Sequence, residues 1–98
     1  MNAARSTPPA GAGFTPAERD RLRRWAAAAR RDLEMDTGGD LAELALIGPR
    51  GLPGWAEWTL GREASGKLRL TRLRGGRGWA VRGVGAAIAR IEAAEGHA

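Results

Sequence analysis

The chain has 98 residues and a mass of 10.4 kDa, which is enough for one small domain but not for two. It has no Cys and its only His is His97, so the sequence excludes disulfides and thiol chemistry and nearly excludes His-based metal sites and acid–base catalysis. No apolar run approaches the roughly 18 residues that a membrane span requires. We therefore expect a small cytoplasmic protein that is not an enzyme, holds no metal or cofactor and does not enter a membrane.

Residues 1–13 are small and polar, and Pro and Gly interrupt them repeatedly. They lack the apolar centre of a secretory signal. Such a segment cannot bury a core, so we expect a flexible N-terminal arm. A single α+β domain should follow over residues 14–98.

The first predicted helix starts after Thr15. Thr15 can cap the helix, Pro16 suits its first position, and Glu18 can complete a capping box. Apolar residues then recur at helical spacing as far as Leu33, which predicts a helix to about Asp36. We interpret the many arginines of this helix as a solvated face with internal ion pairs.

The segment that follows is ambiguous. A second capping pattern starts at Asp40 and favours a short helix from there to about Ile47. The residues Glu43–Ile47, with the sequence ELALI, could instead form a strand. Gly48 and Pro49 would end either element.

From Trp55 the apolar residues follow a period of two, which predicts three short strands joined as antiparallel hairpins. The predicted strands are Trp55–Leu60, Lys67–Leu73 and Trp79–Arg82. Helical spacing returns and predicts a final helix over Val84–Glu95. The expected fold is α+β with the order α-α-β-β-β-α. In it, a three-stranded antiparallel meander is packed by the N-terminal helix, the short second helix and the C-terminal helix.

The alternation within these strands assigns their two faces. The core face receives Ala56, Trp58, Leu60, Leu68, Leu70, Trp79 and Val81. The outer face receives Trp55, Glu57, Thr59, Arg69, Thr71, Ala80 and Arg82. Leu73 falls out of phase, which predicts a bulge or a strand end near Arg72.

The formal net charge of +5 is concentrated in one segment. Between residues 62 and 82 the chain carries six Arg and one Lys against Glu63 alone. Concentrated positive charge favours binding to polyanions. The predominance of Arg over Lys is also typical of GC-rich coding sequences, so part of the excess could be compositional.

The stretch from Arg74 to Trp79, with the sequence RGGRGW, is the most suggestive part of this segment. Arg offers bidentate hydrogen bonds to phosphate, Gly lets a backbone approach closely, and Trp can stack on an unpaired base. The same glycines are also common turn residues. The stretch is therefore either a binding tip or an ordinary turn.

Two other segments partly match nucleotide-binding loops. Gly61–Lys67 has the spacing of a phosphate loop, but Leu68 replaces the Ser or Thr that would hold magnesium and a strand follows. Gly83–Ile88 opens a helix as a dinucleotide fingerprint does, but too few residues follow for a βαβ unit. We interpret the first as a hairpin loop and the second as a strand-to-helix turn.

The leading hypothesis is non-enzymatic binding of nucleic acid, DNA or RNA. An Arg-rich outer sheet face and hairpin tip would neutralise phosphates, while Trp55 would stack on a base. The alternative is a small protein-binding module that docks on an acidic partner surface, such as an inhibitor or adaptor encoded by a phage or another mobile element. The small core and open sheet face also favour a homodimer. Both hypotheses use the same residues: Trp55, Arg62, Lys67, Arg69, Arg72, Arg74, Arg77 and Arg82.

Overall fold

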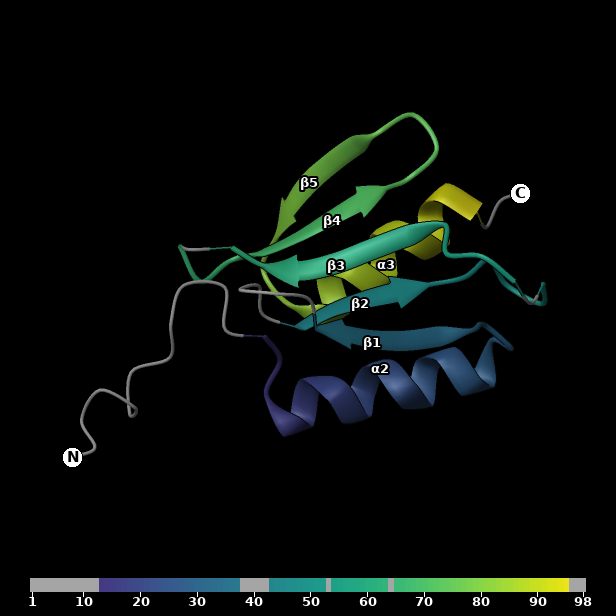
Figure 1. Cartoon of the computed structure of the whole chain (residues 1–98), viewed down its shortest axis with the longest axis horizontal. Coiled ribbons are helices and arrows are strands. Elements are labelled where there is room, and N and C mark those ends of the chain that lie inside the picture. Colours follow the sequence, from purple (N-terminus) through teal and green to yellow (C-terminus); the bar gives the residue numbers. More distant parts are fainter. Residues whose placement is uncertain (1–12, 38–42, 53, 64, 96–98) are drawn as a thin grey trace.

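The computed structural model describes residues 13–37, 43–52, 54–63 and 65–95. Within this part of the chain, a helix precedes and another follows five strands, so the order along the sequence is α-β-β-β-β-β-α (Figure 1). The predicted N-terminal arm lies outside the described residues except for Gly13. The elements are α2 (Pro16–Ala28), β1 (Leu33–Thr37), β2 (Glu43–Ile47), β3 (Trp58–Arg62), β4 (Leu68–Arg72), β5 (Arg77–Val81) and α3 (Val84–Glu95).

The five strands form one antiparallel meander with the spatial order β1-β2-β3-β4-β5. The α+β class is therefore as predicted, but the sheet is larger than the predicted three-stranded meander. The three predicted strands are β3, β4 and β5, with their bounds shifted by up to three residues. The two additional strands lie where the sequence favoured helix.

The first helix begins as predicted. The Glu18 N–H donates to Thr15 Oγ1 at 3.1 Å, and the Thr15 N–H donates to Glu18 Oε1 at 2.8 Å, so the capping box is complete. Pro16 occupies the first helical turn. These contacts fix the start of α2.

The predicted end of this helix at Asp36 is wrong, because α2 stops at Ala28. Arg30 adopts a left-handed backbone conformation with a φ of 58°. The Arg31 N–H then donates to the Ala26 carbonyl at 2.8 Å, which is the reversal of a Schellman-type helix end. Gly usually occupies the left-handed position, so an Arg there gives no signal in the sequence.

The favoured second helix is also wrong, since Glu43–Ile47 forms β2, which is the strand that the sequence left open as the alternative. Ala45 and Ile47 are fully buried, so ELALI alternates between two faces although most of its residues are apolar. The preceding β1 alternates too, with Leu33 and Met35 against the core. Leu33 also continues the helical spacing of α2. The change from helical spacing to the two-residue alternation of β1 is therefore not visible in the sequence.

The core lies on one face of the sheet. Cross-strand pairing aligns Ala45, Leu60, Leu70 and Trp79 across four strands. Within the strands the predicted inward residues of β3 and β4 are buried, and Trp79 packs against the same cluster. The outer-face assignment of Glu57 is wrong, because Glu57 precedes β3 and pairs with Arg72, which is opposite the buried Trp58. Both helices contribute to this cluster through Leu22, Val84, Ala87 and Ile91, so they cover one face together (Figure 1).

The opposite face of the sheet is not covered by any described element (Figure 1). Its charge changes across the sheet, from exposed acids on β1 to an exposed arginine on β4. Small or apolar side chains fill the strands between them. Its residues are Glu34, Asp36, Leu44, Leu46, Thr59, Thr71, Arg69 and Ala80.

The register predicts a large effect at one residue of β3 and a small effect at its neighbour. Leu60→Ala should lower the free energy of unfolding by about 2–5 kcal/mol, because it opens a cavity in a fully buried row. Thr59→Ala, on the uncovered face, should change it by less than about 1 kcal/mol. Urea denaturation of both variants measures the difference, and equal losses would contradict the assignment of the two faces.

Candidate binding surface

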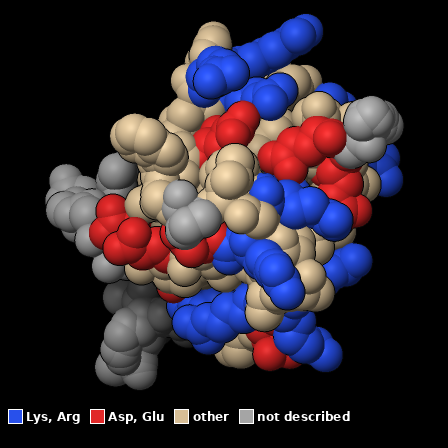
Figure 2. Space-filling view, turned by 90° about the vertical axis from the view of Figure 1, so that its right-hand side faces the viewer, with Lys and Arg blue, Asp and Glu red and all other residues tan. Residues whose placement is uncertain are grey.

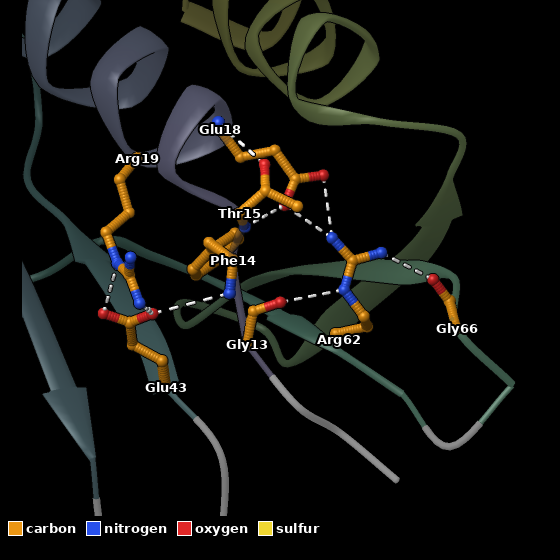
Figure 3. A network of polar contacts seen from close by, with 8 residues as sticks. All are labelled: Gly13, Phe14, Thr15, Glu18, Arg19, Glu43, Arg62 and Gly66. Atoms are coloured by element: carbon orange, nitrogen blue, oxygen red, sulfur yellow. Dashed lines mark hydrogen bonds and ion pairs between the residues drawn. The ribbon is translucent and has the colours of Figure 1, made fainter. Parts of the chain in front are cut away.

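Arg62 belongs to a polar network that fixes the start of α2 to the sheet (Figure 3). Its Nε donates to the Gly13 carbonyl at 2.9 Å, Nη1 to the Gly66 carbonyl at 2.7 Å, and Nη2 to both Glu18 oxygens at 2.6 and 2.7 Å. Almost every donor of its guanidinium group is thus used within the chain. Arg62 is a structural residue here and is not available to a partner.

A second ion pair completes this network (Figure 3). Arg19 donates to Glu43 through Nε and Nη2, at distances down to 2.8 Å. These hydrogen bonds lower the pKa of Glu43 below its ordinary value despite the opposing effect of burial. Burial would raise the pKa of Glu18, but the hydrogen bonds from Arg62 and Thr15 outweigh it and lower the pKa.

Arg72 is likewise held within the fold, at the other end of β3 and β4. It pairs with Glu57 at 3.1 Å, and its guanidinium carbon lies 5.0 Å from the centroid of the Trp58 ring. The side chain points to the face covered by the helices, since Arg72 is opposite the fully buried Trp58. Arg72 therefore stabilises the core and is only partly accessible.

Arg31 departs most from its predicted solvated position, because it is only 6% exposed. It donates to Glu95 at 2.7 Å and to the Gly48 carbonyl at 3.0 Å. Burial would raise the pKa of Glu95, but the hydrogen bonds from Arg31 and the Trp58 indole lower it overall. This buried ion pair joins the end of α3 to the β1–β2 region.

Six exposed cations lie around β5, which is an edge strand of the sheet, whereas the other exposed arginines of the described residues lie on α2, just after it, or in the β2–β3 connection: Arg21, Arg23, Arg24, Arg30 and Arg50. Only one of the six forms an ion pair within the described residues, Arg69 with Glu63 at 3.5 Å. We call the surface around β5 that carries these six cations the β5 edge. Its cations are Lys67, Arg69, Arg74, Arg77, Arg82 and Arg90, all of them exposed.

The pairing register brings some of these cations together. Arg69 is opposite Ala80, and one step beyond the last pair of the ladder, Lys67 comes opposite Arg82. Lys67, Arg69 and Arg82 thus share one corner of the uncovered face. Like charges in directly opposed positions are unfavourable in a free sheet, so this corner favours a bound anion.

The other cations lie at the hairpin end of β5. The guanidinium carbons of Arg77 and Arg90 lie 5.7 and 4.9 Å from the centroid of the Trp79 ring. Gly75 and Gly76 take positive φ values of 90° and 69°, so the RGG sequence does form the turn. Arg74 is exposed on this turn. Trp79, which the sequence assigned to the core, is half-buried and combines a core contact with two cations.

Trp55 is 81% exposed and lies apart from β5, in the connection between β2 and β3. It lines a surface hollow together with Leu52, Leu73 and Arg74. Leu73 follows the end of β4 at Arg72, as its break in phase predicted. The sequence therefore indicated the strand end and an exposed Trp55, but it placed Trp55 in a strand on the outer sheet face, whereas Trp55 precedes β3. It gave no sign that Leu52 and Leu73 lie beside Trp55.

No protein family model, curated protein or solved structure matches this chain. Among the described residues, no group of three His, Asp or Glu side chains could hold a metal ion. None of the described helices has the length and apolar character that spanning a bilayer requires.

The lowered pKa values of Glu18, Glu43 and Glu95 predict instability in acid. A carboxyl whose pKa is lower in the folded state stabilises the fold above its unfolded pKa, and the effect is lost as the pH falls through the folded pKa. The free energy of unfolding should therefore stay nearly constant from pH 7 to about 5.5 and fall below about 4.5. Urea denaturation at a series of pH values measures it.

The double variant Glu18→Gln/Glu43→Gln serves as the control for this titration. It should be less stable than the natural chain at pH 7 and lose less stability on acidification, because two of the three titrating groups are absent. A natural chain equally stable at pH 7 and pH 3 would contradict the assignment.

Proposed function

We propose that this protein is a non-enzymatic nucleic-acid-binding protein that contacts the phosphate backbone along the β5 edge. One observation carries the proposal: six exposed cations flank a single edge strand, and five of them have no carboxylate partner among the described residues. Unpaired surface arginines and lysines attract phosphates and release counterions on binding. The proposal keeps five of the predicted site residues: Lys67, Arg69, Arg74, Arg77 and Arg82.

The length of the β5 edge suits several phosphates. Its strand has five residues, which span about 17 Å at the usual rise of a strand. A duplex presents about five phosphates of one strand over that distance along its axis. Cations lie at both ends of β5, so they can contact successive phosphates of one backbone.

The composition of the β5 edge favours nucleic acid over a protein partner. Protein interfaces usually have an apolar centre surrounded by polar residues. The exposed large apolar residues of the described chain are Leu52, Trp55 and Leu73, and none of them lies on β5. Cations around a short strand that contains Gly are better suited to binding a sugar–phosphate backbone than to binding a protein surface.

The position of Trp79 bears on whether the β5 edge binds single strands by base stacking or contacts only the backbone. Its ring is half-buried and two guanidinium groups lie near it, so an unpaired base could stack there only at its exposed part. Contacts between the cations and the phosphates do not require an exposed Trp79 ring. We therefore propose that affinity comes mainly from phosphates and that sequence preference is weak.

Fluorescence anisotropy with labelled DNA and RNA tests the proposal. The variant Arg77→Gln/Arg90→Gln removes two cations from the β5 edge and should weaken binding at least about tenfold. The control Arg21→Gln/Arg23→Gln removes two exposed cations from α2 and should weaken it by less than about threefold. Both changes lower the net charge by the same amount, so the comparison separates location from total charge.

Two outcomes would overturn the proposal. The first is no binding by the natural chain at low salt, which would leave an acidic protein surface as the partner of these cations. The second is an equal loss in both variants, which would mean that binding follows net charge alone. Circular dichroism checks beforehand that each variant folds. If Arg77→Gln/Arg90→Gln does not fold, Arg82→Gln/Lys67→Gln tests the same edge at its other end.

A further inference from the structure

The three exposed large apolar side chains of the described chain lie at one end of the molecule. Leu52 is 62% exposed, Trp55 81% and Leu73 48%, and all three line the same hollow. They come from the β2–β3 connection and from the residue after β4, which lie at the right of Figure 1. We call these three residues the end patch. Apolar side chains gathered in this way are typical of an interaction surface.

The backbone beside Trp55 is tied to the rest of the fold. The Gly54 N–H donates to Asp32 Oδ2 at 2.9 Å, which joins the residue before Trp55 to the residue before β1. Trp is enriched at the centres of protein interfaces, and a held backbone loses less conformational freedom on binding. Trp55 is therefore the residue of the end patch best suited to the centre of an interface.

The charges on the two sides of Trp55 are opposite. On one side Trp55 shares its hollow with Glu57, whose charge is paired with Arg72, and with Arg74, which has no ion-pair partner among the described residues. On the other side it lines a second hollow with Asp32 and Glu34. Figure 2 looks onto this end and shows acidic groups at the left and towards the top, basic groups at the top, in the centre and at the bottom, and uncharged side chains at the upper left.

We propose that the end patch binds a second copy of this chain in a two-fold symmetric dimer. In such an interface the same surface occurs on both subunits, and a residue on one side of the axis meets the residue from the other side of its partner. With the axis near Trp55, the two indoles pack together. Arg74 of each subunit then faces Glu34 of the other, so one arrangement forms the ion pair twice.

The charge pattern favours a second copy over a different protein. A surface built only for an acidic partner would be cationic on both sides of its anchor, whereas this one is cationic on one side and acidic on the other. Opposite charges across an anchor make a surface complementary to itself under two-fold rotation. The repulsion between two chains of net charge +5 is then offset locally at the contact.

The dimer is expected to be weak, because three apolar side chains from each subunit form a small interface. Dissociation constants in the micromolar range are typical of such contacts, so the equilibrium should be visible at accessible concentrations. This proposal does not rest on the proposed function. If both hold, the dimer carries two β5 edges and binds long nucleic acid more tightly than the monomer.

Sedimentation equilibrium of the full chain between about 1 and 300 µM tests the dimer. The natural chain should pass from monomer to dimer with concentration. Glu34→Arg and Arg74→Glu should each weaken association at least about tenfold, since each places like charges opposite one another twice. The double variant Glu34→Arg/Arg74→Glu exchanges the two charges and should restore the dimer.

A mixture of the two single variants is a still sharper test. Glu34→Arg supplies two arginines and Arg74→Glu supplies two carboxylates, so the mixed dimer contains only favourable pairs. Each variant alone should sediment as a monomer and the mixture as a dimer. Asp36→Arg is the matched control, because it reverses a charge on the same strand away from the two hollows and should leave association unchanged.

Two results would overturn the dimer. A natural chain that stays monomeric at 300 µM would assign the end patch to a different protein or to no partner. Dimerisation that persists unchanged in Trp55→Ala and in both charge variants would place the contact elsewhere. Trp55 is exposed, so Trp55→Ala should fold, and Arg77→Gln/Arg90→Gln should leave the sedimentation unchanged whatever its effect on nucleic-acid binding.

Discussion

The supply of apolar side chains allows only one face of the sheet to be buried, and the rest of the structure follows from this constraint. Both helices cover the same face, and the fully buried Trp58 lies in it beside Trp79, with ring centroids 6.2 Å apart. The indole N–H of Trp58 donates to Glu95 at 3.1 Å, so even the largest core residue needs a polar partner. The other face and the β5 edge are left without a helix to cover them.

The basic residues divide into two groups with different roles. Arg19, Arg31, Arg62 and Arg72 pair with carboxylates and join the helices and loops to the sheet. Because the chain has 16 basic and 11 acidic residues, these pairs leave a surplus of positive charge. The surplus lies largely around β5. The fold thus separates arginines that hold the structure together from those that are accessible to a partner.

The sequence predicted the features that depend on local signals. The capping box at Thr15, the alternation of β3 to β5 and the bounds of α3 all rest on neighbouring residues, and the structure has them. The sequence missed β1, because an Arg replaces the usual Gly at the end of α2 and because Leu33 fits both periods. For Glu43–Ile47 it favoured a helix and kept the strand, which is β2, only as the alternative. The sequence could not distinguish the structural arginines from the accessible ones, since contacts such as that between Glu18 and Arg62 form only through tertiary packing. For the same reason the sequence did not predict that Leu52 and Trp55 line the same hollow.

The salt dependence of nucleic-acid binding tests the central claim most directly. If the natural chain contacts phosphates with the cations of the β5 edge, the logarithm of the association constant for duplex DNA should fall linearly with the logarithm of salt concentration. The slope should lie between about −3.6 and −5.4, because four to six phosphates would be neutralised. A slope near zero, or no binding at low salt, would contradict the account.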